Sequence, residues 1–297
     1  MTTTLDAPRT AVSYDRLART EHHRWWRPLA GTLLVAVGAL VVALGPYLVA
    51  LAALPGLPVD GDGLPVLPDE ADLAAGLAGL GLVIPVVLLA ARWVQRRPAG
   101  TVSSVAGLLR WRWLGRCALL AVPAVVLMYG LLFLLPGEDE AVTWVGWERF
   151  ALGAAVVVLL TPFQAAGEEY VFRGWLIQAF GAWFRSPWPG IVVSSVAFGL
   201  LHGYGTPWGM ADLIFFGVVA AVLTIRTGGL EAAIVLHAAG NVAGLLVAAA
   251  IGGLGSDETA TDADALVVVV DMVMVTLYAA AVLWQSRRVE GQFLLSR

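Results

Sequence analysis

Ionisable and amide side chains lie within the most apolar stretches of this chain: Glu168 with Glu169, His202, His237 and Asn241. Ionisable groups at membrane depth are costly and usually face a protein interior or a water-filled cavity, so by default they mark a functional site. A carboxylate and imidazoles in a shielded cavity suit the activation of water by a general base, and N–H groups nearby can stabilise a developing oxyanion. These residue types therefore predict hydrolytic chemistry within a membrane.

The two adjacent carboxylates have different expected roles. On a helix, Glu169 and Arg173 are four residues apart and share a face, so they can form an ion pair. Glu168 projects about 100° away from that face, which leaves its carboxylate without a counter-ion. A lone carboxylate in an apolar cavity can act as a general base or acid near neutral pH, so Glu168 is the candidate base. The alternative is a pair that only fixes packing, with Glu168 reaching toward the membrane surface.

The histidines and the amide show a four-residue spacing. His202 follows Phe198 by four residues, and Asn241 follows His237 by four, with small residues between them that let another helix approach closely. A rise of about 1.5 Å per residue places Glu168 and His202 about 18 Å from the cytosolic ends of their spans. By the same measure Asn241 lies about 15 Å deep and His237 about 9 Å deep. The four side chains can therefore meet in one layer.

A metal site fits the same residues. Glu168, His202 and His237 could hold a divalent metal such as zinc, because Glu and His are normal zinc ligands and a catalytic site keeps one position open for water. Catalysis by glutamate and histidine alone and catalysis with a metal both stay open at this point.

The composition places the chain in a membrane. The sequence is 59% hydrophobic with a mean hydropathy of +0.80, and 13% of its residues are charged, against about 25% in a soluble domain. We predict an all-α, polytopic bundle, because a spanning helix needs about 20 mostly apolar residues. The chain offers eight such stretches, of which the fifth is short: 29–54, 73–91, 117–135, 150–180, 190–203, 211–225, 232–251 and 266–284.

One further helix is expected outside the spans. Within residues 101–116, leucine and tryptophan are interleaved with Arg110, Arg112 and Arg116. This basic, amphipathic pattern indicates a helix that lies in the membrane interface. A short solvated loop is the alternative.

The arginines predict the orientation, because all 18 basic residues are arginine. Eight spans put both termini on one side, and sixteen arginines then fall on that side, whereas Arg149 falls on the other and Arg173 lies within the fourth span. The positive-inside rule then places both termini in the cytosol, with the chain in the plasma membrane.

Three blocks carry a family resemblance: Glu-Glu-x-x-x-Arg at 168–173, Phe-x-x-x-His at 198–202 and His-x-x-x-Asn at 237–241. In this order, on successive predicted membrane helices, they make residues 150–250 resemble the CPBP family of intramembrane proteases, also called Abi. The family includes CAAX prenyl endopeptidases and proteins of bacteriocin processing or immunity. The resemblance implies an intramembrane endopeptidase that works with glutamate and histidine, with or without a metal.

The resemblance also implies roles for single residues. Glu168 would activate water with the assistance of His202, and His237 with Asn241 would stabilise the oxyanion or contribute to a metal site. Supporting roles would fall to the residues that position this set: Glu169, Arg173 and Phe198. The implied partners are the lipid bilayer and a peptide or membrane-protein substrate, lipidated or not, and no nucleic acid is expected.

These expectations divide the chain into four parts. They are an Arg-rich cytosolic segment (1–28), N-terminal transmembrane helices with the interfacial helix (29–149), a CPBP-like catalytic core (150–251), and a last span with a cytosolic tail (252–297). Asp271 lies about five residues from the outer end of the last span, so we expect it near the interface, with a functional role as the alternative.

Two rival functions belong to other classes. One is a non-catalytic membrane scaffold or bacteriocin-immunity protein with the same fold, which has no need of all four polar residues. The other is a proton-coupled transporter, against which stands the absence of two matching repeats with broken helices. Motifs of other intramembrane proteases, such as His-Glu-x-x-His, Gly-x-Ser-Gly and Gly-x-Gly-Asp, do not occur in the sequence.

Overall fold

The computed structural model describes residues 12–134, 143–256 and 259–295, and in these ranges the fold is all-α, as predicted, with two isolated β-bridges and no strand. The α-helices are α1 (Arg27–Ala53), α2 (Asp69–Gly81), α3 (Val83–Leu89), α4 (Trp111–Leu134), α5 (Trp147–Glu169), α6 (Ile177–Trp183), α7 (Trp188–Leu201), α8 (Pro207–Thr227), α9 (Glu231–Ile251) and α10 (Ala265–Leu295). Short 3-10 turns are η1 (Tyr14–Arg16), η3 (Ala99–Val102) and η5 (Ala260–Asp262), and two π-helical segments are η2 (Ala90–Val94) and η4 (Tyr170–Leu176).

Seven of the eight predicted spans are helices long and apolar enough to cross a membrane, so this is a multi-pass membrane protein. They comprise α1, α2 continued to Val94, α4, α5 continued to Trp183, α8, α9 and most of α10. The remaining stretch, predicted at 190–203, forms α7, which has 14 residues and is therefore only about 21 Å long. Because the hydrocarbon core is about 30 Å thick, α7 is too short to span it, and His202 directly follows its last residue.

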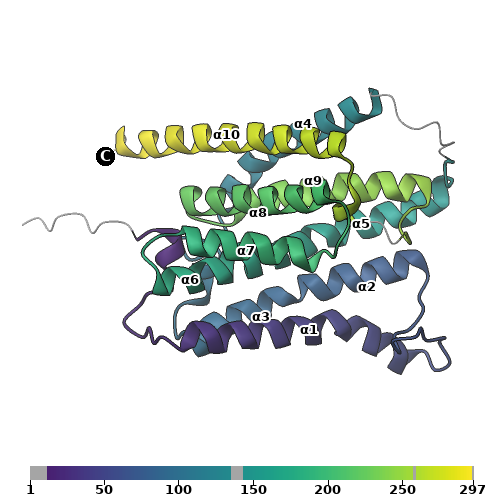
Figure 1. The fold of residues 1–297 in the computed structure, drawn as a ribbon, viewed down its shortest axis with the longest axis horizontal. Helices are drawn as coiled ribbons and strands as arrows, with labels where there is room; N and C mark the ends of the chain where they lie inside the picture. The colour runs from purple at the N-terminus through teal and green to yellow at the C-terminus, as the bar shows by residue number, and fades with distance from the viewer. Residues whose placement is uncertain (1–11, 135–142, 257–258, 296–297) are drawn as a thin grey trace, which may run out of the picture.

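The helices pack side by side with α5 at the centre (Figure 1). α5 contacts α2 on one side and α9 on the other, while α9 also packs against α4, and α8 packs against α7 and α10. Large apolar side chains such as Leu33, Leu119 and Phe133 point outward, as expected where lipid is the solvent. The two helices that carry the predicted carboxylates and the predicted His237 and Asn241 are thus direct neighbours.

α1 begins and α10 ends at the same end of the bundle (Figure 1). Exposed tryptophans occur at both ends: Trp25, Trp111 and Trp188 flank the starts of α1, α4 and α7, whereas Trp147 and Trp208 lie at the starts of α5 and α8. Tryptophan is enriched at both membrane–water interfaces, so these residues indicate where the two surfaces of the bilayer lie. The assignment of the arginine-rich end to the cytosol stays a prediction.

The predicted interfacial helix over 101–116 is wrong. The 103–110 loop follows η3 as turns, and the remaining residues form the first turns of α4. The loop is not helical because its backbone bonds elsewhere: Val105 N–H donates to Gly228 O (2.8 Å), and Ser103 O accepts from Leu230 N–H (3.0 Å). The alternative, a short loop, is confirmed for residues 103–110: Ser103 and Ser104 are buried, and residues 105–108 are exposed.

Arg110 fixes the far end of this loop. Its side chain donates to both carboxylate oxygens of Glu231 (2.9 and 2.7 Å) and to Thr227 O (2.9 Å). Glu231 is fully buried at the first position of α9. The 103–110 loop therefore ties down the start of the helix that carries His237 and Asn241.

Candidate active site

The predicted ion pair between Glu169 and Arg173 is confirmed. Arg173 Nη1 donates to Glu169 Oε1 at 3.0 Å, and both side chains are completely buried. His237 Nδ1 lies 2.9 Å from the same oxygen. Because a carboxylate oxygen accepts hydrogen bonds, Nδ1 of His237 carries the hydrogen, and its Nε2 is left to face the other way.

The guanidinium of Arg173 also lies among aromatic rings. Its central carbon is 4.3 Å from the ring centroid of Phe198, 5.4 Å from that of Phe216 and 5.7 Å from that of Phe172. Nε and Nη2 of Arg173 are buried without a hydrogen-bond partner. Cation–π attraction is stronger for a desolvated cation, so these rings compensate part of the cost of burying the charge.

Glu168 has a different environment from its neighbour. Its Oε1 accepts a hydrogen bond from Gln164 Nε2 (2.6 Å), and its Oε2 is buried without a hydrogen-bond partner among the described residues. His237 Nε2 lies 3.7 Å from Oε2. The side chain of Glu168 is 12% exposed. Glu168 thus has no arginine partner, as the sequence predicted, and instead faces His237.

Gln164 links Glu168 to Asn241, a role that the sequence analysis missed. Gln164 Nε2 donates to Glu168, and Gln164 Oε1 accepts from Asn241 Nδ2 at 3.2 Å. The carboxylate fixes which end of the Gln164 amide donates, and this in turn fixes the orientation of Asn241. The available signal was the four-residue spacing of Gln164 and Glu168, which places both on one helix face.

His202 is held by Phe198, four residues before it. His202 Nδ1 lies 2.8 Å from Phe198 O, so Nδ1 is the donor and Nε2 is free of this contact. The ring of Phe198 lies 4.6 Å from the ring of His202 and 5.7 Å from that of His237. Phe198, which is 1% exposed, therefore contacts both imidazoles.

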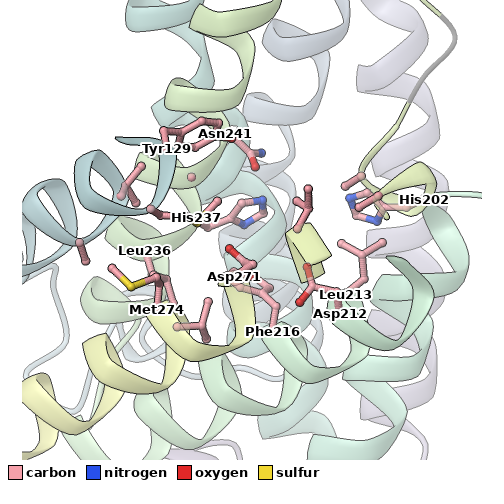
Figure 2. Close-up of a pocket in the computed structure, with 18 of the residues that line it drawn as sticks. Tyr129, His202, Asp212, Leu213, Phe216, Leu236, His237, Asn241, Asp271 and Met274 are labelled. Atoms are coloured by element: carbon pink, nitrogen blue, oxygen red, sulfur yellow. The ribbon is translucent and has the colours of Figure 1, made fainter. Parts of the chain in front are cut away.

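His202, His237 and Asn241 line one pocket of about 250 Å³. This is far more than the roughly 10–15 Å³ that one water needs. The rings of His237 and His202 face the same space (Figure 2). Glu168 does not line this pocket, and its carboxylate lies beside His237 instead. The structure thus brings three of the four predicted residues to one cavity and the fourth to the imidazole of one of them.

Two carboxyl groups share the pocket. Asp212 of α8 and Asp271 of α10 line it. In Figure 2 both carboxyl groups lie below the two imidazoles, Asp271 beneath His237 and Asp212 nearer to His202. Asp271 was expected near the interface but turns inward to the pocket. Asp212 was missed, because no spacing within the sequence pairs a residue of α8 with one of α10.

The predicted metal ligands do not form a cluster. In the described parts of the chain, no three His, Cys, Asp or Glu side chains are grouped so that they could hold a metal ion. Glu168, His202 and His237 have the right donor types, and Glu168 Oε2 is an unpartnered buried oxygen. The arrangement nevertheless does not fit a three-ligand zinc site.

Comparison with known proteins gives a family match over the site. Residues 147–243 match a family model described as type II CAAX prenyl endopeptidase Rce1-like. The chain is 29% identical over 187 residues to the uncharacterized protein YyaK of Bacillus subtilis (strain 168), covering 59% of this chain and 62% of that protein. It is 33% identical over 95 residues to an uncharacterized 24.3 kDa protein of Escherichia coli, covering 31% of this chain and 44% of that protein.

The chain therefore spans less than two thirds of the length of these two relatives. No solved structure matches it significantly. The matched region contains all four predicted catalytic residues and ends before α10.

Proposed function

Because residues 147–243 match the Rce1-like type II CAAX prenyl endopeptidase family model, we propose that this protein is an endopeptidase that hydrolyses a peptide bond with water activated by Glu168. The observation that carries the proposal is the buried, unpartnered Oε2 of Glu168, which faces His237 Nε2 across 3.7 Å. Two polar atoms at this separation can both contact one water molecule.

The charges around Glu168 support a role as base. Glu168 and Glu169 contribute two negative charges and Arg173 contributes one positive charge, so a proton on His237 makes the cluster neutral. Glu169 fixes the orientation of His237, and Gln164 fixes that of Glu168. Such positioning lowers the cost of bringing base and water together.

The reaction has two steps. Glu168 accepts a proton from water while the water oxygen bonds to the carbonyl carbon of the substrate, and the carbonyl oxygen becomes an oxyanion. The carbon–nitrogen bond then breaks, the amine takes up a proton from the Glu168–His237 pair, and a free carboxylate and a free amine leave. General acid–base catalysis of this kind contributes about 10²–10⁴ to the rate.

The N–H groups of the pocket stabilise the oxyanion. Asn241 donates one hydrogen of its amide nitrogen to Gln164. The second hydrogen on that nitrogen can be donated to the substrate. His237 can donate from Nε2 when it is protonated. His202 lines the same pocket, and its Nε2 does not bond Phe198 O, so we assign it an assisting role. Donors fixed in advance at the position of the oxyanion are a large term in catalysis.

Glu168, His202 and His237 would bind a metal only after rearrangement, so the proposed reaction uses the side chains alone. The substrate class is a peptide or membrane protein, lipidated or not, that reaches the pocket from the bilayer. We further propose that the protein resides in the plasma membrane with both termini in the cytosol.

The test compares Glu168→Gln with Glu148→Gln, which changes an exposed glutamate at the start of α5. Purified protein in lipid vesicles is incubated with membrane peptides from cells, and new peptide termini are identified by mass spectrometry. We expect cleavage by wild type and by Glu148→Gln, and a loss of at least about 100-fold in Glu168→Gln. Equal cleavage by all three proteins would remove the proposed role of Glu168, and cell function that survives Glu168→Gln would favour a non-catalytic scaffold.

A further inference from the structure

The pocket has apolar walls and one acidic side. Val125 and Met128 of α4, Leu213 and Phe216 of α8, and Met274 of α10 contribute apolar side chains. The acidic side consists of Asp212 and Asp271, and no arginine lines the pocket. Among the described lining residues, the imidazoles of His202 and His237 are the only groups that can take up a positive charge.

The negative charge of the two carboxyl groups lacks a permanent counter-ion among the described residues of the pocket. The carboxyl groups of Asp212 and Asp271 line the same pocket, and each brings a negative charge to it when it is ionised. Asp212 Oδ1 is buried without a hydrogen-bond partner. Because a buried charge is costly unless it is paired, this side of the pocket favours a ligand that brings a positive charge.

The pocket also includes part of the proposed reaction centre. His237 is only 5% exposed, yet its ring faces the cavity, and its Nε2 makes no hydrogen bond within the described chain. This nitrogen belongs to the centre that would act on the peptide bond. The acidic pair thus lines the same cavity as His237, the partner of Glu168 in the proposed reaction, and this cavity has room for a side chain.

We propose that Asp212 and Asp271 form a specificity subsite that binds the cationic end of a lysine or arginine side chain of the substrate, next to the bond that is cleaved. This inference rests on the proposed endopeptidase function. The aliphatic stem of such a side chain packs against the apolar walls, and its charged end reaches the carboxyl pair. In a site shielded from water this attraction is much stronger than at a surface.

The experiment measures binding separately from cleavage. The full chain carrying Glu168→Gln is purified in detergent, and its Kd is measured for two fluorescent apolar decapeptides that differ at one position, lysine in one and uncharged norleucine in the other. A series of such peptide pairs places the lysine or norleucine at each position of the decapeptide in turn. We expect a Kd at least about 10-fold lower for lysine at one position.

Variants test whether Asp212 and Asp271 cause the preference for lysine. The double change Asp212→Asn and Asp271→Asn keeps the shape of both side chains and removes both charges, and it should bring the two Kd values together. The control Asp264→Asn removes an exposed carboxylate just before α10 that does not line the pocket, and it should keep the preference. If the double variant does not fold, Asp271→Asn alone should reduce the preference.

Equal Kd values at every position, or a lysine preference that survives loss of both carboxylates, overturns the subsite. A lysine preference in binding, with no cleavage of either peptide by the protein that retains Glu168, would instead count against the endopeptidase function and leave the subsite standing.

Discussion

At the residue scale, Glu168 and Glu169 are adjacent in sequence and opposite in environment. Glu169 is fully buried between Arg173 and His237, whereas Glu168 has one amide donor and an unpartnered oxygen. Two carboxylates with different surroundings can take different roles in acid–base chemistry. The helix spacing predicted the ion pair and the free carboxylate. It did not predict the contact of Glu169 with His237, because that contact joins α5 to α9 and depends on how the two helices pack.

We expect Gln164 to raise the rate of peptide cleavage. Gln164→Leu removes the hydrogen bond to Glu168, and a bond to a charged group contributes about 1.5–3 kcal/mol. We expect kcat/KM for peptide cleavage to fall about 10-fold or more. Thr161→Val is the matched control, because the buried hydroxyl of Thr161 has no partner and lies on the same helix. A Gln164→Leu enzyme as active as the control would contradict the role of this residue.

We expect Arg173 to stabilise the folded protein. Arg173→Met leaves Glu169 buried without its guanidinium partner, and breaking a buried pair on one side costs about 3–5 kcal/mol. The double variant with Glu169→Gln should recover part of this loss, because no buried carboxylate then lacks its counter-ion. Denaturant unfolding in detergent measures the difference. A single variant that unfolds like wild type, or a double variant that is less stable than the single one, would refute this account.

At the element scale, the site depends on close contacts between α5, α9 and the 103–110 loop. Ser103 Oγ lies 2.6 Å from the hydroxyl of Tyr170, the residue after Glu169, while Arg110 holds Glu231 at the start of α9. One loop therefore contacts both elements that carry the site. The sequence predicted most helix ranges from their apolar length. It failed for this loop because the arginine that suggested a membrane-surface helix binds a buried glutamate 121 positions away.

Gly167 tests the packing of α5. A Cβ at Gly167 would lie 2.2 Å from Leu80 O at the crossing with α2, and overpacking typically costs about 1–3 kcal/mol. Gly167→Ala should lower the unfolding free energy by this amount and reduce cleavage, because Glu168 is the next residue. Gly115 of α4 has open space around its Cβ position, so Gly115→Ala should stabilise by up to about 1 kcal/mol. Thermal unfolding and activity assays measure both, and a harmless Gly167→Ala would show that this contact is not tight.

At the scale of the whole molecule, the site draws on parts of the chain outside the family match. Residues 147–243 hold the proposed catalytic groups, whereas α4 and α10 supply pocket residues such as Met128, Asp271 and Met274. The sequence predicted a membrane bundle from composition and placed the four polar residues in one layer. It could not predict that α8 and α10 meet at Asp212 and Asp271, because composition does not determine which spans are neighbours.

The arginine distribution predicts the orientation of the bundle. In a Cys117→Ser background, which removes the single cysteine, Ser13→Cys lies before α1 and Ser256→Cys lies after α9, both at exposed positions. A maleimide that does not cross membranes should label Ser256→Cys in intact cells and Ser13→Cys only after the membrane is opened. The reverse pattern would place the arginine-rich end outside the cell, against the positive-inside rule.

The most direct test of the central claim is single-turnover cleavage of one identified peptide by wild type and by Glu168→Gln in water enriched in ¹⁸O. We predict that wild type places one ¹⁸O atom in the new carboxylate and that Glu168→Gln, with peptide affinity unchanged, does so at least about 100-fold more slowly. Equal rates of ¹⁸O incorporation by the two proteins would contradict the activation of water by Glu168.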